Sequence, residues 1–272
     1  MTNYQTLSER RSYYGKPHFW TPKSIKKVPH SLIFDEDTVC EESWGVTEAI
    51  QRTIALGLFL ELPVGEWVLD GRKKETANLP AVALKLLQRN VSDEAKHDQG
   101  FKFAASAYPV SAEIMHEAEL IAEQWLYNDS HPLEKARNAE TGVFLAAGLA
   151  TLRLCGGTSL AGMSESIAVD ESDHVATNEL VLQDLNMKPQ NPNKGLRDLI
   201  SDTLDWLMGD LSIPGSFIGE SYNFDKAFVM EASDSLIETG IAKRLNSLLD
   251  IQVTRSPMEE GNGDIYNRET ED

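Results

Sequence analysis

The stretches VSDEAKHDQGF (91–101) and AVDESDHVATNEL (168–180) share one spacing, in which a histidine follows a glutamate by three residues. Residues three apart lie on the same face of an α-helix, so each stretch can present two metal ligands together. The two pairs are Glu94 with His97, and Glu171 with His174. One such pair is weak evidence, because a chain with 43 acidic residues and 6 histidines can contain one by chance. Two pairs predict a metal site if the fold brings the helices together.

The pattern of apolar residues predicts helices through most of the chain. We find no strand-type alternation of any length, no repeat and no glycine-rich phosphate loop. The predicted fold class is therefore all-α. Pro63 is expected to end the first helix, and the glycine pair 156–157 the fourth. The expected helices are about 43–62, 79–103, 110–128, 132–155, 158–185, 196–211 and 224–250.

The ends of the chain differ in composition from its middle. Residues 1–30 are polar, with prolines spaced too closely for a long helix, and are predicted to form an arm. Residues 31–253 are predicted to form one helical domain. Residues 254–272 contain too few apolar side chains to pack, so we expect a flexible acidic tail.

Charge and cysteine content exclude several classes of protein. A net charge of −18 argues against a nucleic-acid or anionic-membrane partner, since either would repel this surface. Cys40 and Cys155 form no zinc or redox motif, which favours a reducing cytoplasm. The N-terminus lacks the apolar core of a signal peptide. The most apolar segment, 141–157, is short and contains Arg153, so it suits a buried bundle helix better than a membrane span.

The register between neighbouring helices predicts two further ligands. Glu140 and Glu171 lie about equally far from the glycine pair, so an antiparallel hairpin places both carboxylates at one height. At 1.5 Å per residue that height is roughly 20 Å from the turn. If Pro63 ends the first helix, Glu48 and Glu94 are related in the same way about the connection 63–80. Each hairpin is then expected to place one glutamate opposite one Glu-x-x-His pair.

These neighbourhoods are mostly apolar, and a carboxylate on a core-facing stripe must be paired or bound to a metal. Four carboxylates and two histidines at one level are the ligand set of ferritin-like di-metal carboxylate bundles. Oxygen and imidazole donors suit iron or manganese. The predicted ligands are Glu48, Glu94, His97, Glu140, Glu171 and His174.

Three more features distinguish among the functions that such bundles perform. HFWTPKSI places Trp20 in the arm, Asp170 directly precedes Glu171, and the tail carries Tyr266. With these features the sequence resembles the small, radical-generating subunit of class I ribonucleotide reductase. The resemblance implies that Trp20, Asp170 and His97 form a relay for electrons and protons, and that Tyr266 passes the oxidising equivalent to a separate large catalytic subunit. It also implies a homodimer.

Two residues suggest a subgroup of that family. Many members carry an oxidisable tyrosine four residues after the first ligand histidine, where this chain has Phe101. Many also use aspartate as the first ligand, where Glu48 is expected here. Both features resemble the subgroup that stores the oxidising equivalent on a manganese–iron pair, and a dimanganese or di-iron centre is a related possibility.

Two other functions stay open from the residues. A stand-alone di-iron oxygenase or oxidase would use the same ligands on a small molecule. A metal-storage or structural bundle would also use them. Neither gives the Trp20 arm or Tyr266 a role.

Overall fold

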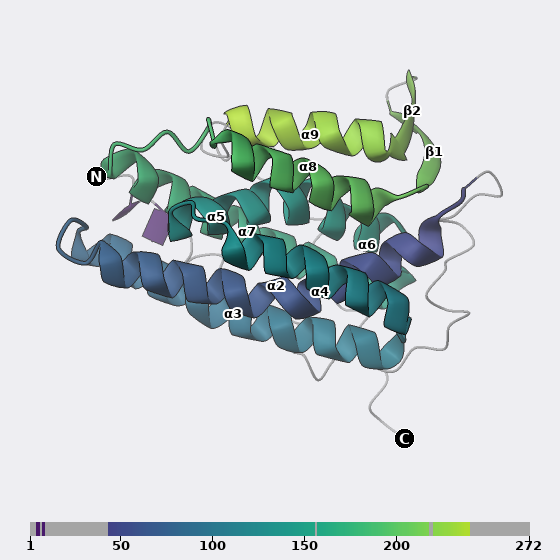
Figure 1. Ribbon diagram of the computed structural model, residues 1–272, viewed down its shortest axis with the longest axis horizontal. Coiled ribbons are helices and arrows are strands. Elements are labelled where there is room, and N and C mark those ends of the chain that lie inside the picture. The colour runs from purple at the N-terminus through teal and green to yellow at the C-terminus, as the bar shows by residue number, and fades with distance from the viewer. Residues whose placement is uncertain (1–3, 6, 9–42, 156, 218–219, 240–272) are drawn as a thin grey trace, which may run out of the picture.

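A computed structural model of the chain describes residues 4–5, 7–8, 43–155, 157–217 and 220–239. These ranges are mostly helical, as the sequence predicts (Figure 1). Trp20, Cys40, Tyr266 and the predicted boundaries at residues 30 and 253 lie outside them. The elements are α2 (Val46–Lys74), α3 (Ala81–Ala107), α4 (Ala112–Tyr127), α5 (Pro132–Ala139), the π-helix η3 (Glu140–Gly148), α6 (Leu149–Cys155), α7 (Gly157–Asp184), α8 (Lys194–Met208), β1 (Ser212–Phe217), β2 (Glu220–Asp225) and α9 (Lys226–Thr239).

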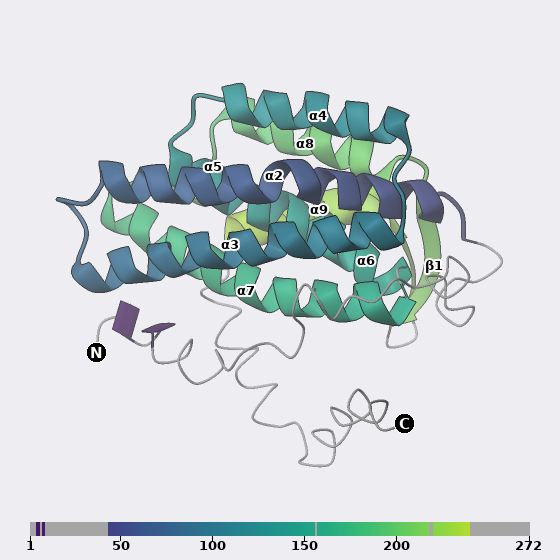
Figure 2. The same ribbon diagram turned by 90° about the horizontal axis from the view of Figure 1, so that it is seen from below.

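Two helical hairpins form the centre of the molecule. α2 and α3 pack antiparallel along their length, and the continuous helical stretch α5–η3–α6 turns back into α7. The hairpins meet through contacts of α3 with α7 and of α2 with α5 and α6. α4 and α8 lie over α2, and α9 packs on η3 (Figure 2).

Local sequence signals explain where several helices begin. Ser111 accepts a hydrogen bond from the Ile114 backbone N–H at 3.2 Å, and Asn193 accepts one from Leu196 at 3.0 Å. Each side chain satisfies a backbone donor that has no partner within its helix. Pro132 occupies the first turn of α5, where the missing N–H costs nothing.

The prediction that Pro63 ends the first helix is wrong. α2 continues eleven residues past Pro63 to Lys74. Its buried stripe continues on both sides of the proline through Leu60, Val64 and Val68, each at most 1% exposed. Burial of such a stripe against α3 outweighs the local cost of proline, about 3 kcal/mol in a helix interior.

A short β-hairpin, which the apolar pattern does not indicate, joins the helices. β1 and β2 form an antiparallel hairpin at the end of the bundle opposite the α2–α3 turn (Figure 1). The backbone of Trp44 pairs with Ser212 on the other side of β1, with N–O distances of 3.1 and 3.2 Å. An isolated hairpin is marginal in water. Here the paired side chains of Ile213 and Phe224 are buried against the bundle, which stabilises two strands too short to show a clear alternation.

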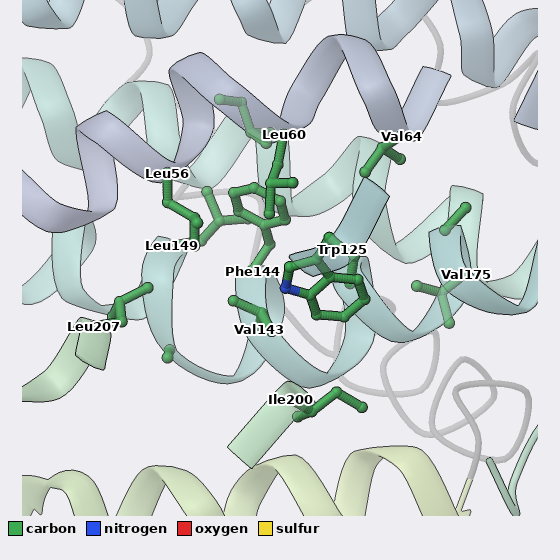
Figure 3. Packing of buried hydrophobic residues seen from close by; sticks show 14 of the residues in the cluster. Leu56, Leu60, Val64, Trp125, Val143, Phe144, Leu149, Val175, Ile200 and Leu207 are labelled. Atoms are coloured by element: carbon green, nitrogen blue, oxygen red, sulfur yellow. The ribbon is translucent and has the colours of Figure 1, made fainter. Parts of the chain in front are cut away.

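The core is continuous between the two hairpins. Figure 3 shows Leu56 and Leu60 of α2 near Phe144 of η3, with the ring of Trp125 close by. The indole N–H of Trp125 donates to Thr203 Oγ1 at 2.9 Å, so this fully buried polar group is satisfied. Within the described ranges, no helix has both the length and the apolar character that crossing a membrane requires.

Candidate metal centre

Six side chains of the types that can ligate metals meet in the interior, between the two hairpins. α2 provides one, α3 two, η3 one and α7 two, and each residue is at most 1% exposed. Their ligand atoms form two groups, within each of which all atoms lie within 4.8 Å of one another. We name these groups the His97 subsite (Glu61, Glu94, His97, Glu171) and the His174 subsite (Glu94, Glu140, Glu171, His174).

Glu94 and Glu171 belong to both subsites. Glu94 directs Oε2 to Nδ1 of His97 at 3.3 Å and Oε1 to Nδ1 of His174 at 2.9 Å. Glu171 directs Oε1 to His97 at 3.2 Å and Oε2 to His174 at 3.4 Å. A carboxylate with one oxygen on each side has the geometry to bridge two ions. Glu61 and Glu140 each belong to one subsite and are the terminal carboxylates.

The outer nitrogens of the histidines contact aspartates across the pair of helices. His97 of α3 directs Nε2 to Asp170 of α7 at 3.4 Å, and His174 of α7 directs Nε2 to Asp93 of α3 at 3.6 Å. Each aspartate directly precedes the bridging glutamate of its own helix. The Asp170 carboxylate lies within hydrogen-bond distance of Nε2 of His97 and so fixes the tautomer and orientation of that ring. The Asp93 carboxylate makes a longer ion-pair contact with His174 and also pairs with Lys96.

Burial and mutual charge displace the pKa values of the cluster. Burial raises the pKa of Glu61 well above its usual value. Burial, and then the charge of Glu171, raise the pKa of Glu140 in the same direction. Burial alone would lower the pKa of His97 and His174, but the surrounding carboxylates raise both well above the ordinary value. Burial therefore favours the neutral form of Glu61 and Glu140, and the carboxylates favour the charged form of both histidines.

The residues fit a pair of divalent cations. Four carboxylates carry four negative charges, which two divalent ions neutralise while the histidines stay neutral. Several buried ligand atoms have no hydrogen-bond partner among the described residues, and leaving such groups unsatisfied is costly. These atoms are Oε1 of Glu61, Glu94 and Glu140, both carboxylate oxygens of Glu171, and Nδ1 of His174. Metal ligation would satisfy all of them.

The structure corrects one predicted ligand. Glu48 lies in the first turn of α2, is exposed, and belongs to neither subsite. It is thirteen residues from Glu61, roughly 20 Å along the helix. The real turn of the first hairpin begins at Glu75, fourteen residues after Glu61, and Glu94 lies fourteen residues after Pro80. Counting from this turn therefore identifies Glu61, by the same argument that led to Glu48.

The structure brings the five other predicted ligands together. Glu94, His97, Glu140, Glu171 and His174 all lie in the cluster, and Asp170 contacts His97 as expected. Phe101 lies one turn after His97, fully buried, with its ring 6.4 Å from that of Phe144. Asp93 was missed, although the sequence contains the signal: Asp-Glu-x-x-His occurs twice, at 93–97 and 170–174.

The comparisons with known proteins add no identification: no family model, curated protein or solved structure matches this chain. The chemistry of the buried cluster is therefore the basis for assigning a function.

Proposed function

We propose that this chain is a ferritin-like di-metal carboxylate protein that acts as the radical-initiating small subunit of a ribonucleotide reductase. The contact of Asp170 with the outer nitrogen of His97, beside two buried Glu-x-x-His pairs on packed helices, is the observation that carries the proposal. The partner would be a large catalytic subunit, and the small subunit would itself be a homodimer in the cytoplasm.

The metals, when bound, would supply a one-electron oxidant, with a manganese–iron pair favoured and dimanganese or di-iron pairs as alternatives. Asp170 orients His97 and, at 9% exposed, lies at the edge of the buried cluster. The indole N–H of Trp20 is the donor that we propose for that position, since a carboxylate accepts it readily. Tyr266 would carry the oxidising equivalent from the tail to the large subunit.

A stand-alone oxygenase or oxidase is the second candidate. The contact between Asp93 and His174 favours it, because it mirrors the contact between Asp170 and His97. A relay that leaves the site in one direction needs only one of these contacts. A symmetric pair also suits a centre that acts on a small molecule without passing an electron to a partner.

The test is deoxynucleotide formation by the protein reconstituted with manganese and iron, together with the large subunit from the same genome. Asp170→Asn and Tyr266→Phe should each abolish turnover while metal content stays normal. Asp93→Asn is the matched control, because it makes the equivalent change on the other histidine. It should retain substantially more turnover than Asp170→Asn.

Equal losses for the two aspartate variants would contradict a relay through Asp170. Near-normal turnover by Tyr266→Phe would remove the tail from the mechanism and favour the oxidase. Consumption of oxygen with a small substrate in the absence of any large subunit would support the second candidate directly.

A further inference from the structure

The two terminal carboxylates are held differently. Asn178 donates its side-chain N–H to Oε2 of Glu140 at 3.2 Å, and both residues are fully buried. In the other subsite, Oε1 of Glu61 has no hydrogen-bond partner among the described residues, and Oε2 lies 3.4 Å from Nδ1 of His97. A neutral amide therefore fixes one terminal carboxylate, whereas the other faces a ring that itself belongs to the site.

Asn178 is well placed to set the direction of Glu140. It lies one helical turn after His174 on α7, so the helix that carries a histidine and a bridging glutamate also carries this amide. Because Oε2 of Glu140 is engaged, Oε1 is the atom that faces the subsite, 3.8 Å from Nδ1 of His174. The carboxylate is then oriented before any cation arrives.

We propose that Asn178 is a positioning residue that makes the two subsites unequal, so that the His174 subsite binds the first divalent cation and the His97 subsite the second. This inference rests on the proposed di-metal centre. Because the Glu140 carboxylate is already oriented, less binding free energy is lost in ordering it, and the His174 subsite has the higher affinity. The second cation must orient Glu61 and share two bridging carboxylates whose charge the first has partly neutralised. Unequal subsites also let a mixed pair of metals load in sequence.

In the experiment, the metal-free protein is titrated with Mn²⁺. Bound metal is measured by equilibrium dialysis and by the EPR signal of the free ion. The unsubstituted protein should bind two ions in a tighter and a weaker step. Glu61→Ala should keep the tighter step, and Glu140→Ala should lose it. Asn178→Leu should weaken the tighter step by about 10- to 100-fold, the usual effect of removing a residue that orients a ligand.

Two further variants separate hydrogen bonding from packing. Asn178→Asp keeps the size of the side chain but cannot donate in its ionised form, so it should weaken the tighter step as well. It also carries the test if Asn178→Leu does not fold. Thr177→Val is the matched control: Thr177 is buried on the same helix, its hydroxyl donates to Asp173 O at 2.8 Å, and the change should leave both steps intact.

Each outcome is decisive. Unchanged binding in Asn178→Leu, an equal loss in Thr177→Val, or loss of the weaker step alone would overturn the role of Asn178. Retention of the tighter step by Glu140→Ala would overturn the order of filling. If the unsubstituted protein binds no metal, the di-metal centre itself fails, and this result is distinguishable from the others.

Discussion

At the scale of single residues, Glu61 and Glu48 show that position along one helix separates a candidate metal ligand from a surface charge. Both are glutamates of α2. Glu61 is 1% exposed and joins three other ligands within 4.8 Å, whereas Glu48 is exposed in the first turn. An acidic side chain there faces the positive end of the helix dipole, which is a favourable and ordinary place for it.

Replacing the two glutamates should therefore have different effects on metal content. Glu61→Ala removes the terminal carboxylate of the His97 subsite, so the protein should retain about one ion per chain instead of two. Glu48→Ala should retain both. Metal analysis after exhaustive dialysis measures this directly. Retention of two ions by Glu61→Ala, or loss of one by Glu48→Ala, would refute the assignment of Glu61.

Phe101 bears on where an oxidising equivalent would be stored under the proposed function. It is fully buried one turn from His97, and its ring has no proton to lose. We expect activated protein to show no tyrosyl radical at this position, with the oxidising equivalent held by the metals. EPR of activated protein, with Phe101→Tyr as the comparison, tests this. A tyrosyl signal in the unsubstituted protein that persists when all tyrosines distant from the centre are replaced would contradict it.

At the scale of elements, the face of α2 that lies toward the cluster has a glycine one turn before Glu61 and another one turn after it. Gly57, Glu61 and Gly65 follow one another at four-residue spacing. A Cβ at Gly57 would lie 2.5 Å from the Phe101 ring, and one at Gly65 would lie 3.2 Å from Cβ of Glu94. The glycines therefore let α3 approach closely enough to share a metal site with α2.

Gly57→Ala should lower stability although alanine is the better helix former. The added methyl meets the Phe101 ring, which is fully buried beside Phe144 and has little room to move. Overpacking of this kind costs about 1–3 kcal/mol. Gly162→Ala is the control, since among the described residues no atom beyond the backbone of its own helix lies within 4 Å of its Cβ position on α7. It should stabilise the protein by about 0.5–1 kcal/mol. Urea unfolding followed by circular dichroism measures both, and a stabilising Gly57→Ala would disprove the close contact.

The π-helix links the candidate metal centre to the end of the described chain. Glu140 is its first residue, and Ser233 of α9 donates to the carbonyl of Gly142 within it at 2.8 Å. Just before it, the fully buried Arg137 donates to the carbonyl of Ile237 at 3.1 Å. These hydrogen bonds hold α9 against the helical stretch that contains Glu140. The packing of α9 therefore supports the position of this side chain.

At the scale of the whole molecule, four of the carboxylates that give the chain its net charge of −18 lie together at its centre. Burying them without cations is unfavourable. A cation that binds the folded state and not the unfolded chain stabilises the protein, by about 2.7 kcal/mol per site at a concentration of 100 times the dissociation constant.

Chelation should accordingly lower the melting temperature, and added Mn²⁺ should restore it. Differential scanning fluorimetry across a range of Mn²⁺ concentrations measures the effect. Glu171→Ala is the control, because it removes a carboxylate shared by both subsites and should make the melting temperature nearly independent of Mn²⁺. A melting temperature that does not change on chelation of loaded protein would contradict a metal centre in the core.

The sequence by itself determined the helical class, both Glu-x-x-His pairs and Glu140. These predictions follow from short-range spacing. A separation of three residues places two side chains on one face of a helix. The glycine pair marks a turn, and residues equally far from it on the two helices lie at the same height. Asp170 followed from a resemblance. The second Asp-Glu-x-x-His motif, which includes Asp93, is equally visible in the sequence, but the role of its aspartate was not predicted.

Tertiary structure decided the rest. Pro63 is a strong local signal for a helix end, yet packing of α2 against α3 carries the helix past it, and this moved the ligand from Glu48 to Glu61. The hairpin of β1 and β2 depends on burial at the end of the bundle and on backbone pairing with Trp44, contacts between residues far apart in the chain. The hydrogen bond from Asn178 to Glu140 joins residues 38 positions apart. Local propensity carries no information about such contacts, because their free energy appears only when distant segments are packed together.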